Sequence, residues 1–295
     1  MTVGDEGAGP IVPRRSVLYM PAANARALEK AKTIPADALI LDLEDAVAPD
    51  AKPTARDQAC AAVAGGGYGR REVTVRCNGL DTPWGADDIA AAAAVGPAAI
   101  VVPKVSGAAQ LGEIADRLER AGAPEHTMIW PMVETPTALF AIREIAGFPR
   151  VAALILGTND LAKELRAALI PGRTPLLPHL ATALLGAREA GVAAIDGVYN
   201  DVHDLTGFEA ECVQGAQLGY DGKTLIHPGQ VEIANRVWAP SDEEIDYARR
   251  VIDAFEQALA ERRGVVTVDG KMIENLHVDN ARRILAVSEA IRARN

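Results

Sequence analysis

Short apolar runs recur eight times along this chain of 295 residues, and each is followed by a longer segment of helical character. Strands buried on both faces have such runs, and their alternation with helices indicates βα units around a parallel sheet. Eight units over roughly 230 residues fit an α/β fold of the TIM (β/α)8 barrel type. The expected strands are Ser16–Met20, Ala38–Asp42, Glu72–Arg76, Ala98–Pro103, Met128–Met132, Ala152–Leu156, Ala193–Asp196 and Lys223–Ile226.

The main competing fold is a doubly wound open sheet. Its dinucleotide-binding members carry a Gly-rich fingerprint after a strand, and none follows any expected strand here. Abundant Ala, Val, Leu and Ile with few aromatic residues suit helices packed on a buried parallel sheet. We therefore expect the barrel, with helices that include Asn24–Ala31, Trp84–Val95, Ala108–Ala121, Pro136–Ala146, Thr174–Ala190 and Val202–Leu218.

Both ends of the chain depart from the βα pattern. Residues 1–13 contain acids and no apolar core of a signal peptide, so we expect a disordered lead-in before a barrel domain of residues 14–238. Beyond it, Ser241–Arg263 is predicted to form one long helix with an acidic first turn, followed by a strand or turn over Gly264–Gly270 and a final helix around Asn280–Arg292. Residues 239–295 thus form a C-terminal helical extension, which we interpret as a lid over a barrel mouth, its own or that of a neighbouring subunit.

Charge and composition exclude several classes of protein. The net charge of −10 argues against nucleic-acid binding, which needs a basic face. No apolar run approaches the roughly 20 residues that span a bilayer, so we expect no membrane contact and a cytoplasmic location. The three cysteines are far apart and lack CxxC spacing, which predicts reduced thiols. No Ser-His-Asp or GxSxG arrangement supports serine-based hydrolysis.

Two apolar runs lead directly into a carboxylate, Glu134 in IWPMVETP and Asp160 in LILGTNDLA. Carboxylate oxygen is what Mg²⁺ prefers, and this ion takes one or two such groups while keeping waters or substrate in its other positions. Consecutive barrel strands deliver both groups to the same rim, so the pair predicts a metal site. The alternative is that Glu134 caps the helix beginning near Pro136 and that Asp160 closes a turn.

Other polar side chains also follow the expected strands, as a barrel active site at the carboxyl ends requires. The segment LDLEDAV contains three acids, whose mutual repulsion calls for a compensating metal or for Arg76. Alternation along a strand places Glu44 and Asp45 on opposite sides. The full set of rim candidates is Asp42, Glu44, Asp45, Arg76, Asn78, Lys104, Glu134, Asn159, Asp160, Asp196 and His227.

The chemistry of this rim suits an anionic substrate. Arg76 is able to pair with a substrate carboxylate through two parallel hydrogen bonds, or it simply neutralises the nearby acids. Gly157 opens a tight turn before Asn159, where backbone amides also reach an anion. A hard cation that holds a 2-oxo or 2-hydroxy acid points to chemistry through an enolate, with one group moving a proton. Near the amino terminus Arg14, Arg15, Arg26, Lys30 and Lys32 form a basic cluster for phosphates, or a solvated helix face.

A series of longer motifs runs along the chain in the order RRSVLYMPAANARALEKAKTIPADALILDLEDAVAPDAK, VTVRCNG, VVPKV, IWPMVETP, LGTNDLA, IDGVYND, KTLIHPGQV and DGKMIENLH. On these motifs the chain, from about Arg14 to its end, resembles the citrate lyase β-subunit-like branch of the HpcH/HpaI aldolase superfamily. That branch includes malyl-CoA, β-methylmalyl-CoA and citramalyl-CoA lyases and malyl-CoA thioesterases. The resemblance implies a TIM barrel with a C-terminal extension, assembled as a homotrimer or homohexamer.

The resemblance also implies roles for individual residues. Glu134 and Asp160 match the Mg²⁺ ligands, and Arg76 matches the residue that holds the substrate carboxylate. Substrate-binding positions are then Arg76, Glu134, Gly157 and Asn159, and Arg15 and Lys30 are the expected contacts to CoA phosphates. The implied reaction is reversible cleavage of a 3-hydroxyacyl-CoA, such as malyl-CoA or citramalyl-CoA, to an acyl-CoA and a 2-oxo acid, with Arg76, Asp45 and Glu274 as catalytic residues.

One motif departs from the family. The lyases end in a sequence like GxMID, whose Asp reaches a neighbouring subunit as acid or base, whereas this chain has Met272-Ile273-Glu274. The open alternatives are a malyl-CoA-type thioesterase, a citrate lyase β subunit acting on a carrier-bound citryl thioester, and a binding protein that has lost the chemistry. Aldolases of the superfamily that use a His base are disfavoured, because LDLEDAV has no His.

Overall fold

The computed structural model describes residues 11–261 and 265–294. These residues divide into two compact units, one spanning residues 14–237 and the other beginning at Trp238 and including residues 11–13. Most of the expected lead-in, residues 1–10, lies outside the described residues.

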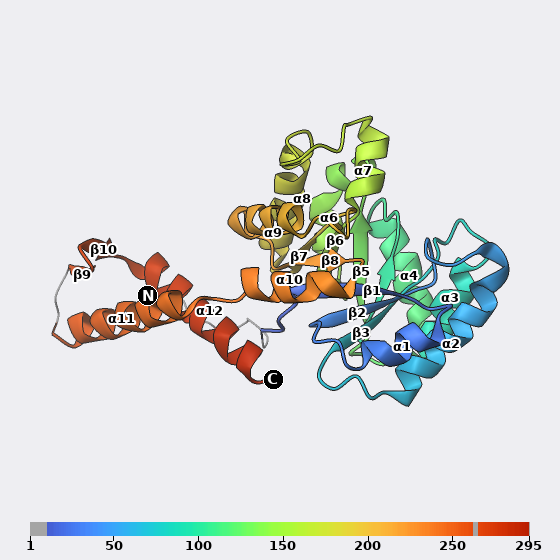
Figure 1. The fold of residues 1–295 in the computed structure, drawn as a ribbon, viewed down its shortest axis with the longest axis horizontal. Helices are drawn as coiled ribbons and strands as arrows, with labels where there is room; N and C mark the ends of the chain where they lie inside the picture. The colour runs from blue at the N-terminus through green and yellow to red at the C-terminus, as the bar shows by residue number, and fades with distance from the viewer. Residues whose placement is uncertain (1–10, 262–264, 295) are drawn as a thin grey trace. The chain divides into compact units, whose positions relative to one another are not determined.

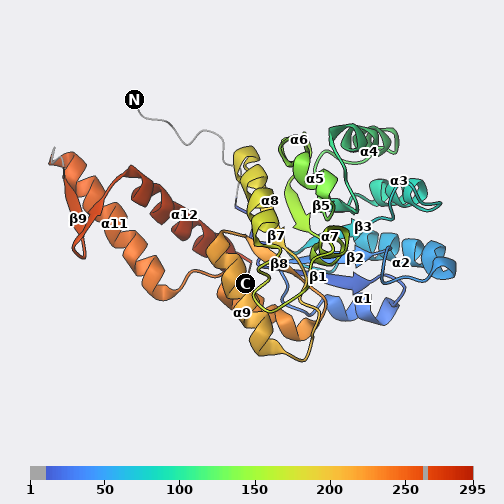
Figure 2. The same ribbon diagram turned by 90° about the horizontal axis from the view of Figure 1, so that it is seen from above.

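The first unit is a closed barrel of eight parallel strands in the order of the sequence, with β1 paired to both β2 and β8 (Figure 1, Figure 2). The predicted TIM barrel is thus confirmed. All eight expected strands exist, and every bound agrees to within one residue. The strands are β1 Ser16–Pro21, β2 Ala38–Asp42, β3 Glu72–Arg76, β4 Ala99–Val102, β5 Met128–Val133, β6 Ala153–Leu156, β7 Ala193–Asp196 and β8 Gly222–Leu225.

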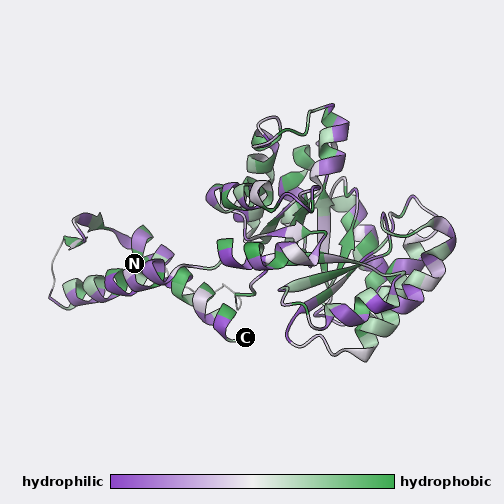
Figure 3. Ribbon diagram, in the orientation of Figure 1, coloured by the Kyte–Doolittle hydropathy of each residue, from purple (hydrophilic) through white to green (hydrophobic). Residues whose placement is uncertain are grey.

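Alternate strand residues fill the inside of the barrel, because successive side chains of a strand point to opposite faces. The interior is hydrophobic, as the green strands of Figure 3 show, and the helices around them combine apolar and polar faces. The largest side chain of the barrel interior, Trp130, is fully buried. The inward cluster comprises Val17, Ala38, Ile40, Ala99, Val101, Trp130, Met132, Ala153, Ile155 and Ile195.

The helices of the first unit depart from the prediction at several points. The expected helix Pro136–Ala146 is two short helices that meet at Ala141, and the prediction did not name the helices Lys52–Gly65, Thr158–Leu165 and Val231–Val237. The elements between the strands are α1 Ala25–Ala31, η1 Pro49–Ala51, α2 Lys52–Gly65, α3 Gly85–Val95, α4 Ala108–Arg120, α5 Pro136–Phe140, α6 Ile142–Ala146, α7 Thr158–Leu165, α8 Leu177–Ala190, α9 Leu205–Leu218, η2 Pro228–Gln230 and α10 Val231–Val237.

The second unit contains α11 Asp242–Ala260, a hairpin of β9 Val266–Val268 and β10 Lys271–Ile273, and α12 Asn275–Arg292. Ser241 and Glu244 exchange hydrogen bonds at the start of α11, a capping box that satisfies two otherwise unpaired amides. The final helix was predicted from Asn280 but begins at Asn275, directly after the hairpin. In the part of the chain that the structure describes, no helix is long and apolar enough to cross a membrane.

Candidate active site at the carboxyl ends of the strands

The polar residues of the rim continue the inward-facing columns of the barrel interior. Asp42 lies two residues after Ile40, and Glu134 lies two residues after Met132, so both carboxylates point inward above an apolar floor. A cavity of about 460 Å³ opens at this end of the barrel. It is lined by Tyr19, Pro21, Asp42, Asp45, Ala46, Arg76, Met132, Glu134, Leu156, Gly157, Thr158, Asn159, Asp160, Val198, Asn200, Thr224 and Ile226.

Arg76 is the centre of a buried ion-pair network in this cavity. It lies opposite Asp42 in the β2–β3 register, and its Nε and Nη2 donate to the two Asp42 carboxylate oxygens at 2.6 and 2.7 Å. Its guanidinium also stacks 4.8 Å from the centre of the Tyr19 ring. With 7% of Arg76 exposed, this pairing fixes the direction in which its remaining N–H groups point.

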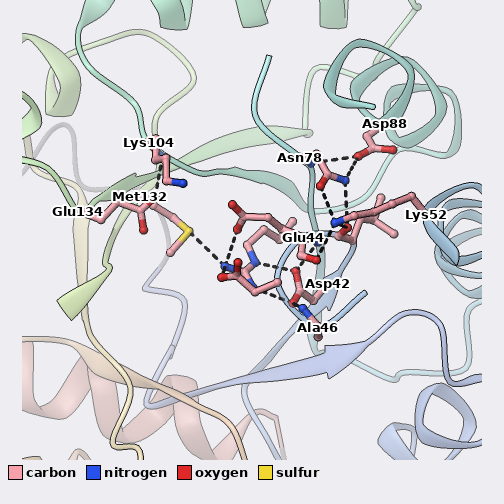
Figure 4. A network of polar contacts seen from close by, with 12 residues as sticks. Asp42, Glu44, Ala46, Lys52, Asn78, Asp88, Lys104, Met132 and Glu134 are labelled. Atoms are coloured by element: carbon pink, nitrogen blue, oxygen red, sulfur yellow. Dashed lines mark hydrogen bonds and ion pairs between the residues drawn. The ribbon is translucent and has the colours of Figure 1, made fainter. Parts of the chain in front are cut away.

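Glu44 and Asp45 both reach the third guanidinium nitrogen, Nη1 of Arg76, at 2.7 and 3.2 Å. The expectation that they lie on opposite sides is therefore wrong. Strand β2 ends at Asp42, and beyond it the backbone turns, so the alternation of a strand no longer applies. Asp42 holds this turn by accepting hydrogen bonds from the amides of Glu44 and Ala46 (Figure 4). Arg76 thus neutralises the acids of LDLEDAV, as one of the sequence-based alternatives predicted.

Glu134 is almost fully buried, with 2% exposed, and its Oε1 accepts a hydrogen bond of 2.6 Å from the backbone amide of Lys104 (Figure 4). It does not cap the following helix. Thr135 performs that function, because its hydroxyl oxygen accepts from the amide of Ala138. Helix capping therefore does not explain the presence of Glu134. Its second carboxylate oxygen, Oε2, is left for another partner in the cavity.

Asp160 lies in the first turn of α7, four residues beyond the end of β6. It lines the same cavity as Glu134 and is close enough that its charge raises the Glu134 pKa. Among residues 11–261 and 265–294, no group of three or more His, Cys, Asp or Glu side chains is placed to hold a metal ion. A pair of carboxylates with open space beside it suits a cation that keeps waters or substrate oxygens as its other ligands.

Two of these carboxyl groups titrate far from the usual range. Burial raises the pKa of Glu44 and of Glu134 from 4.5 to about 7 in each case. Neighbouring acids raise both pKa values further, and the charge of Arg76 lowers both. The hydrogen bond from the Lys104 amide lowers the pKa of Glu134 as well. The folded protein therefore binds these protons more tightly than the unfolded chain does between about pH 4.5 and 7.

The stability of the protein without metal is accordingly expected to rise as the pH falls from 8 to 5.5. Over this range the folded state takes up protons on Glu44 and Glu134 that the unfolded state does not, and proton uptake by the folded state alone is stabilising. Thermal melting in a chelating buffer measures it. Glu134→Gln removes one of the two groups and should flatten the rise; equal slopes in the two proteins would contradict the assignment.

Gly157 lies where any side chain would strike Glu134. A Cβ atom built there would lie 2.3 Å from Oε2 and 2.5 Å from Cβ of Glu134. Since the backbone φ of −92° suits any residue, the requirement for glycine comes from this contact and not from backbone strain. Gly157 therefore shapes the pocket for the Glu134 carboxylate.

We expect Gly157→Ala to leave the barrel folded but to weaken divalent-cation binding at least about tenfold. The added methyl group causes an overpacking cost of about 1–3 kcal/mol, and the protein relieves part of it by displacing the Glu134 carboxylate from its position for the cation. Titration calorimetry with Mg²⁺ measures this. The matched control is Gly112→Ala in α4, where an added Cβ meets nothing within 4 Å and the change should stabilise the helix by up to about 1 kcal/mol. Equal Mg²⁺ affinities for both variants would contradict the expectation.

The remaining predicted residues divide between the cavity and other places. Asn159 lines the cavity and exchanges two side-chain hydrogen bonds, of 3.0 and 2.8 Å, with Asn200. Asp196 is buried elsewhere, between Arg173 and Lys223. Other rim candidates that do not line the cavity are Glu44, Asn78, Lys104 and His227.

The two residues expected to contact CoA phosphates do not line this cavity. Arg15 precedes β1, at the opposite end of the barrel, and Asp37 accepts hydrogen bonds from its Nε and Nη2 at 2.8 and 2.9 Å. A buried guanidinium that is already paired with a carboxylate does not fit the predicted phosphate contact. Lys30 is exposed in the last turn of α1. In the second unit, Glu274 is exposed at the start of α12, where its backbone amide donates to His277 Nδ1.

Sequence reasoning missed three side chains that shape the site. Tyr19 lies under Arg76, Lys52 holds the turn after β2, and Asn200 pairs with Asn159. Tyr19 shares the inward parity of Val17 in β1, which was a usable signal. Lys52 is ten residues from Asp42 in the chain, and only the path of the backbone brings its ammonium group back to the strand end.

The first unit has the fold of the TIM-barrel enzymes, with buried acids and the Arg76 guanidinium at the carboxyl ends of its strands, where such enzymes have their active sites. Residues 15–228 match the model of the HpcH/HpaI aldolase/citrate lyase family. The chain belongs to this family, and it is therefore an enzyme of a lyase family that acts on CoA or carrier-protein esters. The resemblance identified from the motifs is confirmed.

Individual relatives cover nearly the whole chain. A (3S)-malyl-CoA thioesterase of Cereibacter sphaeroides (strain ATCC 17025) is 49% identical over 95% of this chain and 96% of the relative. The citrate lyase subunit beta of Escherichia coli (strain K12) is 38% identical over 94% of this chain and 93% of its own length. The crystal structure of CitE from Mycobacterium tuberculosis with magnesium, acetoacetate and coenzyme A matches with a TM-score of 0.76 and 28% identity, covering 94% and 98% of the two chains.

Proposed function

We propose that this protein is a Mg²⁺-dependent enzyme that reversibly cleaves a 3-hydroxyacyl-CoA, such as malyl-CoA or citramalyl-CoA, to an acyl-CoA and a 2-oxo acid. The observation that carries the proposal is the composition of the cavity. Among the residues that the structure describes, four acids line it, Asp42, Asp45, Glu134 and Asp160, against one basic side chain, Arg76. A site with this excess of negative charge accepts an anionic substrate only with an added cation.

The donor set fits Mg²⁺. Glu134 and Asp160 offer carboxylate oxygens from neighbouring βα units, and the open cavity leaves room for water and substrate oxygens. These two residues would hold the ion, and when bound it supplies a Lewis acid for the oxygen of a 2-oxo acid. The magnesium, acetoacetate and coenzyme A bound to the CitE of M. tuberculosis support this proposal.

Arg76 would bind the carboxylate of the 2-oxo acid. Asp42 pairs with Nε and Nη2 of Arg76 and so orients the guanidinium. The third nitrogen, Nη1, contacts Glu44 and Asp45. A substrate carboxylate would approach Nη1 from the cavity, beside Asp45, which lines the cavity and whose side chain is 74% exposed. The Tyr19 ring limits the guanidinium on one face.

Cleavage requires two proton movements. The substrate hydroxyl loses a proton as the carbon–carbon bond breaks, and the bond's electron pair passes to the thioester α-carbon, which then takes a proton. Asp45 lies beside Arg76 and is our proposal for the group that accepts the hydroxyl proton. Glu274 of a neighbouring copy, in the proposed trimer or hexamer, is our proposal for the group that protonates the α-carbon.

Glu274→Gln is expected to lower kcat by about 10²- to 10⁴-fold, the usual contribution of one positioned general acid or base. Glu274→Asp should retain part of the rate, because it keeps the carboxyl group one methylene shorter. Steady-state kinetics with malyl-CoA measures both. Asp279→Asn, an exposed acid farther along α12, is the control and should leave kcat unchanged. A kcat of Glu274→Gln equal to that of the control would remove Glu274 from the mechanism.

A second candidate reaction is hydrolysis of the malyl-CoA thioester, favoured by the thioesterases at 48–49% identity. The purified protein, incubated with malyl-CoA and Mg²⁺, distinguishes the two reactions. Cleavage yields glyoxylate and acetyl-CoA in equal amounts, whereas hydrolysis yields malate and free CoA. Neither pair of products from malyl-CoA or citramalyl-CoA, with the protein folded, would overturn the proposal.

The relatives called citrate lyase subunit beta raise a third possibility, a citryl thioester on a carrier protein. Co-purification with such a carrier, together with inactivity on free CoA esters, would favour it. For the CoA ester itself, Lys30 is our proposed phosphate contact. Its exposed position leaves the ammonium group free to meet a phosphate in solution.

A further inference from the structure

Lys52 lies buried beneath the turn that follows β2. It is the first residue of α2 and is 5% exposed. Its Nζ donates hydrogen bonds of 2.7 Å to the carbonyl oxygens of Leu43 and Glu44 and to Oδ1 of Asn78 (Figure 4). All three N–H groups of the ammonium are therefore used, and Nζ lies 5.3 Å from the centre of the Trp84 ring.

The third partner of Lys52 is itself held rigidly. Asn78 Nδ2 donates to the carbonyl of Leu43 at 2.9 Å and to Asp88 Oδ2 at 2.6 Å, and the Asn78 backbone amide donates to the same Asp88 oxygen. Asp88 is fully buried and accepts a further hydrogen bond from Arg56. The hydrogen bonds that hold Lys52 thus continue from the residues after β3 into α3.

The geometry explains why a lysine occupies this position. Two successive carbonyls, of Leu43 and Glu44, point at one place, and buried carbonyls need donors. An ammonium is a compact point charge that supplies three of them in a tetrahedral arrangement, whereas the guanidinium of arginine is a planar fork. Burial lowers the pKa of Lys52, and the charges of Asp42, Glu44 and Asp88 oppose that change.

The turn held by Lys52 carries the acids that contact Arg76. Asp42 fixes it from one side through the amides of Glu44 and Ala46, and Lys52 fixes it from the other through the two carbonyls. Between these two anchors, the side chains of Glu44 and Asp45 reach Nη1 of Arg76. Without the ammonium, the carbonyl of Leu43 keeps Asn78 Nδ2 and the carbonyl of Glu44 keeps the Val47 amide, but both lose the one charged donor that ties them together. The peptide units that carry both acids are then held less firmly.

We propose that Lys52 is a positioning residue of the active site, which sets where the Glu44 and Asp45 carboxylates meet Arg76. The inference rests on the proposed function, because Arg76 and Asp45 act there on the substrate. Lys52 itself touches no substrate. Its effect is on the placement of Asp45 for proton transfer, and a displacement of about 1 Å at a reacting group costs on the order of 10²-fold in rate.

The test uses Lys52→Met, which keeps the length of the side chain and removes the donors, and Lys52→Arg, which keeps the charge but not the tetrahedral geometry. Lys223→Met is the matched control, since Lys223 is also a buried lysine of the same barrel but pairs with Asp196 and Glu211. We expect both Lys52 variants to lower kcat about 10- to 100-fold, with KM changed less than about threefold. The acid limb of the kcat–pH profile should also shift. Lys223→Met should lower the melting temperature while leaving that profile in place.

A second measurement does not depend on catalysis. Amide hydrogen exchange of residues 43–47 should accelerate at least about tenfold in Lys52→Met but not in Lys223→Met, because four amides of this turn lie in the hydrogen-bond network that Lys52 anchors. If Lys52→Met does not fold, Asn78→Ala removes one of the three acceptors and should give the same changes at smaller size.

The outcomes separate this inference from the proposed function. Absence of lyase and thioesterase activity in the unaltered protein, together with faster exchange in Lys52→Met, overturns the function but leaves the anchoring of the turn. Unchanged exchange and an unchanged pH profile in an active Lys52→Met overturn the inference alone. Full recovery of kcat in Lys52→Arg also overturns it, because charge without geometry would then suffice.

Discussion

Arg76→Lys is expected to lower kcat/KM for the CoA ester by about 10²- to 10⁴-fold. Lysine keeps the charge but cannot donate two parallel hydrogen bonds to Asp42 while offering a further N–H to substrate. Loss of two charge-assisted hydrogen bonds, each worth about 1.5–3 kcal/mol, accounts for this range. Steady-state kinetics in the cleavage and condensation directions measures it.

The effect on stability should be smaller than the effect on rate, because the ammonium still compensates the buried Asp42 and Glu44. Arg76→Met would leave these acids unpaired and should cost about 3–5 kcal/mol in the free energy of unfolding. The control is Arg117→Lys in α4, a partly exposed arginine paired with Glu113, where neither activity nor stability should change appreciably. Arg76→Lys with the kinetics of this control would show that Arg76 only neutralises its neighbours.

Glu134→Gln is expected to weaken Mg²⁺ binding by more than about 100-fold and to abolish activity at ordinary Mg²⁺ concentrations. Changes to residues that merely orient a metal ligand cost 10- to 100-fold, so replacement of a ligand's charged oxygen costs at least as much. Glutamine keeps the size of the side chain and an oxygen for the Lys104 amide, so the fold should persist. Calorimetry and the Mg²⁺ dependence of the rate measure the change.

Asp160→Asn should have an effect of the same kind, and the double variant should lose little more than either single one, because both carboxylates serve one ion. Glu119→Gln, on the exposed face of α4, is the control and should bind Mg²⁺ as the unaltered protein does. Undiminished Mg²⁺ affinity in Glu134→Gln would remove the metal site from this end of the barrel.

The barrel and its strands were predictable because each strand is a local apolar run whose length and spacing are visible in the sequence. The same parity places Asp42 and Glu134 at the ends of inward-facing columns. Beyond the last strand residue this reasoning stops. Glu44 and Asp45 converge on one nitrogen of Arg76 because the backbone turns there, and a period of two residues does not describe a turn.

Helices were less predictable where local rules conflict. The segment after Glu134 carries one apolar pattern but is broken at Ala141. After β6 the strand end was predicted correctly, but α7 begins two residues later, so Asp160 lies in a helix. Asp160 therefore reaches the cavity from a helix and not from a strand. Its proximity to Glu134 is tertiary, since it depends on how far α7 lies over the barrel mouth.

The sequence alone established the class of fold, the inward columns and the acids that end them, since alternation and short-range spacing are properties of neighbouring residues. Tertiary structure decided which groups meet. The pairing of Arg76 with Asp42 follows from the register of β2 and β3. The hydrogen bonds from Lys52 to the carbonyls of Leu43 and Glu44 follow from the path of the chain into α2. Such contacts join residues whose separation along the chain carries no periodic signal, so only the closed barrel determines their distance.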